Sequence, residues 1–227
     1  MAIVLLVRHG RTTANSAGIL AGRSPGVLLD ETGHDQATRM GRRLADAPLV
    51  RVVTSPLERC RETSQAILDH QEIAVDLIAD EAITECDYGR WQGRALKELA
   101  DEPLWSTVQA QPSAAVFPEG ESLAAMQARA VAAVRRIDAA VEAEHGPGAV
   151  WAAVSHGDII KSVLADALGM HLDLFQRLHV DPASVSIVRY GRQRPDVVCS
   201  NSSAGDLGWL RGAGEAGDAP VGGGAGR

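Results

Sequence analysis

The sequence predicts an open α/β fold in which strands and helices alternate along one domain. The main observation is a pair of short apolar runs, residues 2–7 and 149–154, each followed by one polar residue and then by His-Gly. A second observation is the apolar spacing typical of amphipathic helices between these runs. Open α/β sheets bind ligands at the carboxyl ends of their strands. We therefore expect His9 and His156 at one edge of the sheet, although they are far apart in the sequence.

Length and composition exclude several classes of protein. The chain has 227 residues, of which 22% are charged and 45% hydrophobic, so we expect one domain with a full core. A net charge of −7 disfavours nucleic acid as a partner, because phosphate backbones bind basic faces. The N-terminal apolar run ends at Arg8, too short for a signal peptide or a membrane span, which predicts a cytoplasmic protein with no membrane partner. The three cysteines are widely spaced, as expected for reduced thiols.

The first half of the chain alternates strand and helix patterns. In order, the predicted elements are a strand at 2–7, a loop at 10–26, a helix at 31–46, a strand at 50–54, a helix from 56, a strand at 73–78 and an irregular segment at 82–88. The first helix places Ala37, Met40 and Leu44 on one face. Ser55-Pro56-Leu57-Glu58 has the form of a capping box with proline at the first helical position, which predicts a helix that begins at Pro56.

The second half contains the longest predicted helix, which begins after Gly120. Its apolar positions recur at steps of three or four residues and are Leu123, Met126, Ala130, Val134, Ile137 and Val141. The helix is expected to end at Gly146-Pro147-Gly148. The remaining predicted elements are a strand at 149–154, a helix that ends at Gly169, and strands at 184–190 and 195–200.

The end of the chain differs in composition from the rest. Residues 212–227 are mostly Gly and Ala and have no periodic apolar face. Such a segment buries too little surface to offset its ordering entropy, so it is predicted to be a disordered tail. The folded domain is accordingly expected over residues 1–211.

Polar side chains suited to phosphate chemistry fall at the predicted strand ends. Arg8 lies beside His9, Arg59 is in the first turn of the helix after the second strand, and His156 follows a third strand. Guanidinium groups and imidazoles beside free helix amides predict a site for a tetrahedral oxyanion, most simply phosphate. Glu85, in the irregular segment, adds a carboxyl group that can donate a proton. These residues indicate phosphoryl transfer through a histidine nucleophile.

Four motifs over about residues 2–200 carry a resemblance to a known family. In chain order they are Leu6-Val7-Arg8-His9-Gly10, Ser55-Pro56-Leu57-Glu58-Arg59-Cys60-Arg61-Glu62-Thr63, Glu85-x-x-Tyr88-Gly89-x-Trp91-x-Gly93 and Ser155-His156-Gly157. Together they resemble the histidine phosphatase superfamily, which includes cofactor-dependent phosphoglycerate mutase. The resemblance implies a three-layer α/β/α sandwich around a mostly parallel sheet and a covalent phosphohistidine on His9.

The resemblance also implies roles for individual residues. Arg8, Arg59 and His156 would hold the transferring oxygens, and Glu85 would protonate the leaving group and then activate water. Further substrate-binding candidates are Thr12, Asn15, Gly22, Arg23 and Gly157. Because the arginines and imidazoles supply positive charge, we expect neither a metal ion nor another cofactor.

Two features bear on the substrate. Arg11 stands where the common pattern has Glu or Gln, and it either adds charge near the pocket or points to solvent. Mutases of the family carry a basic insertion, whereas residues 86–121 contain three basic residues and six acidic ones, which favours hydrolysis of small phosphorylated metabolites. Phosphoglycerate mutase-type transfer and a non-catalytic phospholigand-binding module remain alternatives. The oligomeric state is left open, with a homodimer as one alternative.

Several residues have ordinary explanations. Cys60 is expected to be a buried, inert thiol, and Trp91 and Trp105 are expected in the core or over the pocket. Glu81 and Asp87 are alternatives to Glu85 as proton donor, because they lie close to it in the sequence. The ordinary expectation for each of the three is an exposed carboxylate without a catalytic role. The remaining histidines are expected at the surface or at helix caps and are His34, His70, His145, His171 and His179.

Overall fold

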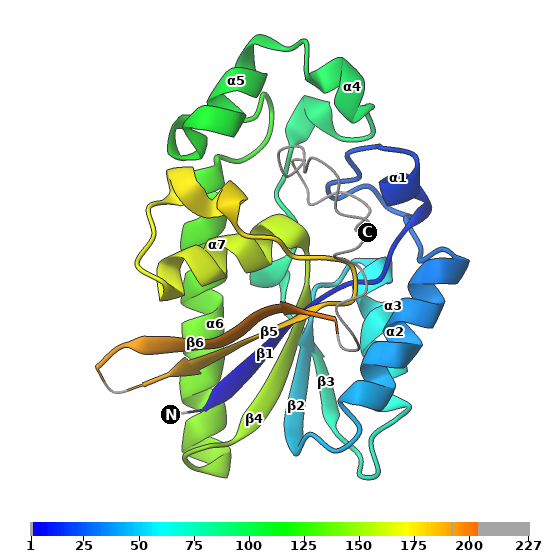
Figure 1. Cartoon of the computed structure of the whole chain (residues 1–227), viewed down its shortest axis with the longest axis vertical. Helices are drawn as coiled ribbons and strands as arrows, with labels where there is room; N and C mark the ends of the chain where they lie inside the picture. Colours follow the sequence, from blue (N-terminus) through cyan, green and yellow to red (C-terminus); the bar gives the residue numbers. More distant parts are fainter. Residues whose placement is uncertain (1, 192, 204–227) are drawn as a thin grey trace, which may run out of the picture.

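A six-stranded sheet is the centre of the part of the chain that the computed structural model describes, residues 2–191 and 193–203 (Figure 1). The strands are β1 (Ile3–Arg8), β2 (Leu49–Thr54), β3 (Asp76–Ala79), β4 (Val150–Ser155), β5 (Val185–Tyr190) and β6 (Pro195–Ser202). Their spatial order is β3-β2-β4-β1-β5-β6. The first four strands are parallel, and β5 and β6 add an antiparallel edge, so the predicted mostly parallel sheet is confirmed.

Helices cover both faces of this sheet and create two separate cores. On one face lie α2 (Glu31–Arg43) and α3 (Glu58–Leu68), and on the other lie α6 (Leu123–His145) and α7 (Gly157–Ala167). Successive side chains of a strand point to opposite faces. Accordingly, Leu5 and Val7 of β1 join the core on the α2 and α3 side, whereas Val4 and Leu6 join the core on the α6 and α7 side. This arrangement confirms the three-layer sandwich.

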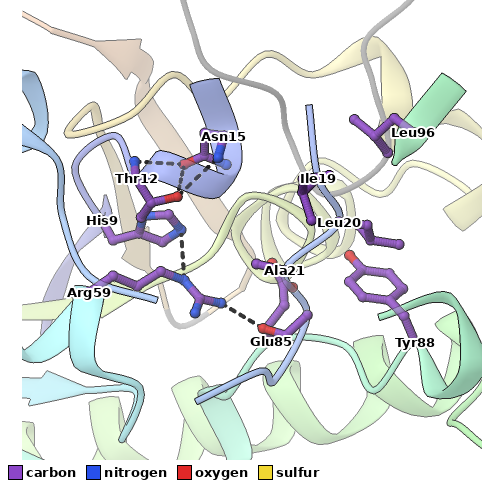
Figure 2. A pocket seen from close by; sticks show the side chains of 11 residues that line it. His9, Thr12, Asn15, Ile19, Leu20, Ala21, Arg59, Glu85, Tyr88 and Leu96 are labelled. Atoms are coloured by element: carbon purple, nitrogen blue, oxygen red, sulfur yellow. Dashed lines mark hydrogen bonds between the residues drawn. The ribbon is translucent and has the colours of Figure 1, made fainter. Parts of the chain in front are cut away.

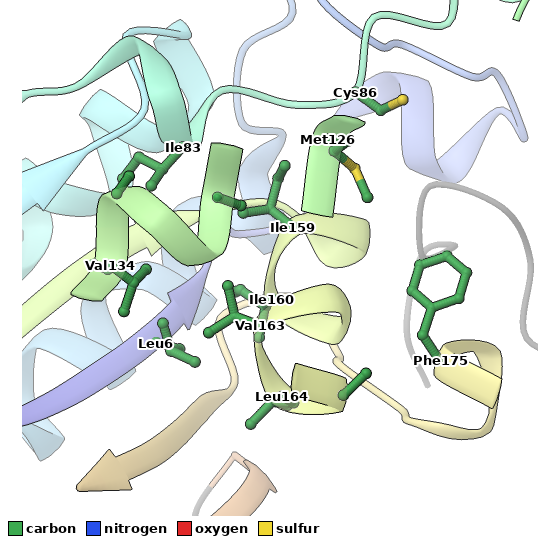
Figure 3. Close-up of a cluster of buried hydrophobic side chains, with 14 of the residues drawn as sticks. Leu6, Ile83, Cys86, Met126, Val134, Ile159, Ile160, Val163, Leu164 and Phe175 are labelled. Carbon is green, nitrogen blue, oxygen red and sulfur yellow. The ribbon is translucent and has the colours of Figure 1, made fainter. Parts of the chain in front are cut away.

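The core between β1, α6 and α7 is built as the periodicity of the sequence predicts. Val134 of α6 and Ile160, Val163 and Leu164 of α7 surround Leu6 of β1, and all five side chains are almost completely buried (Figure 3). The ends of α6 are also as expected. Ser122 caps its first turn by accepting a hydrogen bond from the Ala125 amide, and Gly146 ends it with a φ of 88°.

The predicted start of the second helix is wrong. α3 begins at Glu58, two residues after Pro56, and its N-cap residue Leu57 makes no side-chain capping bond. The Ser55 hydroxyl lies instead 2.8 Å from Nε2 of His156, at the end of a neighbouring strand. The hydroxyl thus has a tertiary partner, and its local contact is reduced to a long hydrogen bond accepted from the Leu57 amide at 3.4 Å. The third strand also differs, because β3 begins at Asp76 rather than at residue 73 and forms an exposed edge.

Short helices beyond the carboxyl ends of the strands were not predicted. They include α1 (Thr13–Ser16) inside the expected loop and α4 (Leu96–Leu99) and α5 (Pro103–Ala110) in the segment before α6, seen at the top of Figure 1. Short 3-10 turns complete the connections and are η1 (Glu81–Ile83), η2 (Gly89–Trp91), η3 (Pro112–Ala114) and η4 (Leu172–Arg177). Trp91 is buried and stacks on the half-buried Trp105 with ring centroids 6.1 Å apart, as expected for core residues.

Two sequence predictions are limited by the extent of the structure. The predicted disordered tail at 212–227, and with it the domain boundary at residue 211, lies outside the described residues. Within the described ranges, no helix is long and apolar enough to cross a membrane.

Candidate active site

A pocket opens at the carboxyl edge of the parallel strands, where the sequence places the candidate site. It is lined by His9, Thr12, Asn15, Ile19, Leu20, Ala21, Gly22, Arg59, Glu85, Tyr88 and Leu96 (Figure 2). The empty space among these side chains is about 400 Å³, including the part open to solvent.

The strand register brings the two His-Gly motifs together. Arg8 of β1 pairs with Ser155 of β4, so His9 and His156 follow at adjacent positions of two neighbouring parallel strands. Their rings meet edge to face with centroids 5.3 Å apart. The expectation that two residues distant in sequence lie side by side is met by this geometry.

His9 is held in a neutral form with one nitrogen facing the pocket. Its Nδ1 lies 2.7 Å from the carbonyl oxygen of Gly10. A carbonyl only accepts, so Nδ1 carries the proton and Nε2 keeps its lone pair. Burial, together with the guanidinium groups of Arg59 and Arg8, lowers the pKa of His9 well below its usual value. An unprotonated Nε2 is the form that can attack an electrophile.

Arg59 connects the groups around the pocket. Its Nε donates to His9 Nε2 at 3.3 Å, and its Nη2 donates to the Gly22 carbonyl at 2.7 Å and lies 3.2 Å from His156 Nδ1. The side chain is 2% exposed, and no described residue accepts a hydrogen bond from Nη1. A buried guanidinium nitrogen without a protein acceptor favours an anion in the pocket, because an unsatisfied charged donor is costly.

His156 lies behind His9 and Arg59 and does not line the pocket. Arginine only donates, so Nδ1 accepts from Arg59 and Nε2 donates to the Ser55 hydroxyl. Burial and the nearby Arg59 lower the pKa of His156 well below its usual value. Its Nδ1 lies 3.9 Å from Oε2 of Glu85, which brings the carboxyl group into the same cluster.

Glu85 is a buried carboxyl group at the floor of the pocket, 4% exposed. Its Oε1 accepts a hydrogen bond from the Cys86 amide at 2.9 Å. Burial, and then the charge of Asp158, raises the pKa of Glu85 to about 7. A carboxyl group with this pKa can give up and regain a proton near neutral pH. Neither rival shares this position, because Glu81 is exposed and Asp87 is partly exposed and absent from the pocket lining.

Arg129 of α6 fixes the backbone that carries Glu85. Its guanidinium donates to three carbonyl oxygens, those of Ala82 at 2.9 Å, Thr84 at 2.7 Å and Glu85 at 3.0 Å, and pairs with Glu121. Arg23 reaches the same Glu85 carbonyl at 2.8 Å and the same Glu121 carboxylate at 3.0 Å. The two arginines therefore neutralise Glu121 and hold the segment from which the Glu85 carboxyl group projects.

The other candidate residues divide into two groups. Thr12, Asn15 and Gly22 line the pocket, and the Asn15 carboxamide oxygen accepts from both the amide and the hydroxyl of Thr12. The second group, Arg8, Arg23 and Gly157, does not line it. Arg8 is fully buried and donates to the Val180 carbonyl at 2.8 Å, and burial lowers its pKa to about 10.

Arg11 and Cys60 are explained by local contacts. Arg11 neither faces the pocket nor points freely to solvent, because its Nε pairs with Asp30, the N-cap residue of α2, at 2.8 Å. Cys60 is fully buried, and burial raises the pKa of its thiol to about 12, as expected for an inert thiol. Among the described residues, no three or more His, Cys, Asp or Glu side chains are placed to hold a metal ion.

Sequence reasoning missed several residues of the site. Ser55 was interpreted as a helix cap, although it binds His156. Arg129 lies between Met126 and Ala130, two buried residues of α6. This position predicts that Arg129 lies near the core, but it does not indicate which groups the side chain binds. Ile19 and Leu96 come from a loop and a one-turn helix without apolar periodicity, so nothing in the sequence places them beside a ligand.

The fold and this cluster define a class of phosphate-handling α/β proteins, and the comparison with protein families agrees. The model of the histidine phosphatase superfamily (branch 1) matches residues 4–203, so the chain belongs to that superfamily. The match covers all four motifs of the sequence.

Curated relatives differ in length and name. An adenosylcobalamin/alpha-ribazole phosphatase from Salmonella typhimurium is 31% identical over 73% of this chain and 79% of its own. A relative from Erwinia tasmaniensis, named a probable phosphoglycerate mutase, is 30% identical over 82% of this chain and 83% of its own. The chain spans about half the length of mycobacterial relatives that are 33% identical over 82% of it.

Solved structures show the same fold. The structure of YhfR from Bacillus stearothermophilus superposes with a TM-score of 0.80, covering 89% of this chain and 98% of that one. The two sequences are 24% identical, so this likeness concerns the fold alone.

Proposed function

We propose that the protein is a phosphomonoesterase that hydrolyses small phosphorylated metabolites through a phosphohistidine on His9. The observation that carries the proposal is the pairing of an unprotonated His9 Nε2 with the buried Arg59 guanidinium in one pocket. The first group can attack phosphorus, and the second can stabilise its oxygens. The name of the Salmonella relative supports hydrolysis of a phosphate ester.

The proposed reaction has two steps, and Glu85 donates a proton in the first and accepts one in the second. In the first, the Nε2 lone pair of His9 attacks phosphorus, the ester P–O bond breaks, and protonated Glu85 donates its proton to the leaving oxygen. In the second, water attacks the phosphohistidine, the Glu85 carboxylate accepts a proton from that water, and the N–P bond breaks. Inorganic phosphate leaves and His9 is restored. A pKa of about 7 suits both roles of Glu85.

The positive groups have different tasks in this proposal. Arg59 holds the transferring oxygens directly, because it lines the pocket. His156 and Arg8 act from behind it, His156 through its bond to Arg59 and Arg8 through its buried charge. Asn15 keeps its amide nitrogen for the substrate, because Thr12 occupies its oxygen. The remaining candidates, Arg23 and Gly157, are proposed to act on the frame of the pocket.

Transfer to a second substrate is the alternative that one observation favours, namely the name of the Erwinia relative. A mutase must return the phosphoryl group to another position of an anionic substrate, whereas a phosphatase gives it to water. Parallel incubations with p-nitrophenyl phosphate and with 3-phosphoglycerate distinguish the two, because a phosphatase releases inorganic phosphate from the first compound and a mutase forms the 2-phospho isomer of the second. A non-catalytic binding module would do neither.

The test of the proposed mechanism separates Glu85 from Arg59. We expect Glu85→Gln to slow alkyl phosphate hydrolysis by roughly 10²- to 10⁴-fold and p-nitrophenyl phosphate hydrolysis much less, because p-nitrophenolate departs without protonation. Arg59→Ala should slow both substrates alike, because it removes charge stabilisation that every substrate shares. Equal losses for both leaving groups in Glu85→Gln would assign the acid role to another residue.

The nucleophile has its own test. His9→Ala should abolish hydrolysis of every phosphomonoester, and the wild-type protein should carry an acid-labile, base-stable phosphoryl group on His9 after rapid quenching. Wild-type turnover in His9→Ala would refute the covalent mechanism.

A further inference from the structure

The pocket has two chemically different sides (Figure 2). His9, Arg59 and Glu85 gather at one end, where the proposed chemistry takes place. The opposite side is formed by apolar side chains and one aromatic ring, namely Ile19, Leu20, Ala21, Leu96 and Tyr88. We call these five residues the apolar wall. A phosphate ester bound at the first end would place its alcohol portion against this wall.

Backbone hydrogen bonds fix the apolar wall in place. The Leu20 amide donates to the Arg94 carbonyl at 3.0 Å, and the Leu20 carbonyl accepts from the Gly93 amide at 2.8 Å. The Leu96 amide donates to the Gly18 carbonyl at 2.9 Å, which continues the same antiparallel pairing. The segments that carry Ile19 and Leu96 are therefore tied to each other, so the wall is preorganised for a ligand.

The hydroxyl group of Tyr88, the aromatic residue of the apolar wall, already has a hydrogen-bond partner. The Tyr88 hydroxyl donates to Asp158 Oδ2 at 2.8 Å, and Asp158 lies 3.8 Å from the buried ammonium of Lys161. Because this network engages the hydroxyl and the side chain is fully buried, Tyr88 backs the wall from the core and gives the pocket no hydrogen-bonding group.

Positive charge is confined to the phosphate end. Within the described residues, the lining contains no Lys and no Arg other than Arg59. On the wall's own segments, Arg23 pairs with Glu121 at 3.0 Å and Arg94 with Glu102 at 2.6 Å, and Lys97, which follows Leu96, is exposed and absent from the lining. A second anionic group on a substrate would therefore lose its hydration against the wall without gaining a cation.

From this geometry we infer that the site selects phosphomonoesters of uncharged alcohols with an apolar body, and discriminates against substrates that carry a second anionic group. The inference rests on the proposed phosphatase function and refines its substrate class. It is carried by the apolar wall and by the absence of a second lining cation among the described residues.

The experiment compares three alkyl phosphates in the wild-type protein. The substrates are 2-phenylethyl phosphate, glycerol 3-phosphate and 3-phosphoglycerate. Their alcohol portions are respectively apolar and uncharged, polar and uncharged, and anionic, and each phosphoryl group is bound to a primary alcohol oxygen. We expect kcat/KM to fall in that order by about tenfold or more at each step, the size of effect that apolar pocket contacts give. A kcat/KM for 3-phosphoglycerate equal to or above that for 2-phenylethyl phosphate overturns the inference.

Variants locate the preference in the wall. Leu96→Lys should lower kcat/KM for 2-phenylethyl phosphate and raise it for 3-phosphoglycerate. The ratio of the first kcat/KM to the second should therefore fall by about tenfold or more. Leu168→Lys, at an exposed leucine at the end of α7, is the matched control and should leave the ratio unchanged. An unchanged ratio in a folded Leu96→Lys protein overturns the assignment to the wall. If no phosphate ester is hydrolysed and His9 acquires no phosphoryl group, the proposed function itself has failed.

Discussion

The buried carboxyl group of Glu85 makes a prediction about stability that is independent of any substrate. Its pKa is about 7 in the folded protein, against 4.5 for an ordinary glutamate, mainly because of burial and then because of the charge of Asp158. Between these two pH values the folded state keeps a proton that the unfolded state has lost. Stability must therefore fall as the pH rises through this interval. Glu85→Gln removes the titration and with it this part of the pH dependence.

The magnitude follows from the width of the interval. Each pH unit over which the two states differ by one proton changes the free energy of unfolding by about 1.4 kcal/mol. Between pH 5 and pH 8 the wild-type protein should therefore lose about 2 to 3 kcal/mol more stability than Glu85→Gln. His9 and His156 also titrate, with pKa values lowered by burial, but they are present in both proteins.

Urea unfolding followed by tryptophan fluorescence at pH 5 and pH 8 measures this double difference. The matched control is Glu72→Gln, which changes an exposed glutamate and should leave the pH dependence of stability at its wild-type value. A double difference near zero, or one of opposite sign, would show that Glu85 is ionised in the folded protein at neutral pH. The proposed acid role would then lose its basis.

Three further predictions concern the positioning of Glu85 by Arg129, the need for a metal ion, and the packing of Gly33. Arg129→Lys keeps the charge but loses most of the bonds to the Glu85 segment, so hydrolysis of alkyl phosphates should fall by about tenfold or more while p-nitrophenyl phosphate is less affected and KM changes little. A parallel loss for both substrates would argue against positioning of Glu85. Chelators should leave activity within about twofold, because Arg59 and the buried arginines supply the positive charge; activity lost on chelation and restored by one divalent ion would contradict this. Gly33→Ala should lower the free energy of unfolding by about 2 kcal/mol or more in urea titrations, because its Cβ would collide with the Arg11 carbonyl. Stabilisation by the roughly 1 kcal/mol of alanine helix propensity would refute that reasoning.

The elements predicted well are those whose signal is local. β1 and β4 are short apolar runs that end at a polar residue, and this pattern also placed His9 and His156 at the right edge of the sheet. The six periodic apolar positions of α6 predicted its buried face, and Ser122 and Gly146 mark its ends. In these cases the same residues set both the local conformation and the burial.

The features that escaped prediction depend on partners distant in sequence. The capping prediction at Ser55 was wrong because His156 takes the hydroxyl across the sheet. The carbonyls that Arg129 binds lie more than forty residues away, and a helix periodicity cannot indicate them. Ile19 and Leu96 come to the pocket through backbone pairing between two irregular segments, which leaves no pattern in either segment alone.

The position of β4 has a consequence for the synthesis of the protein. β1 and β2 precede the other strands of this sheet in the chain, but they do not pair with each other, because β4 lies between them in the finished sheet. The ribosome adds about 5–20 residues per second, so roughly 5 to 30 seconds pass before residues 150–155 can pair with these strands, and until then each strand keeps an unpaired edge. The nascent chain should therefore be enzymatically silent during this time. Activity should appear in a single step, when β4 enters the sheet and His156 reaches Arg59.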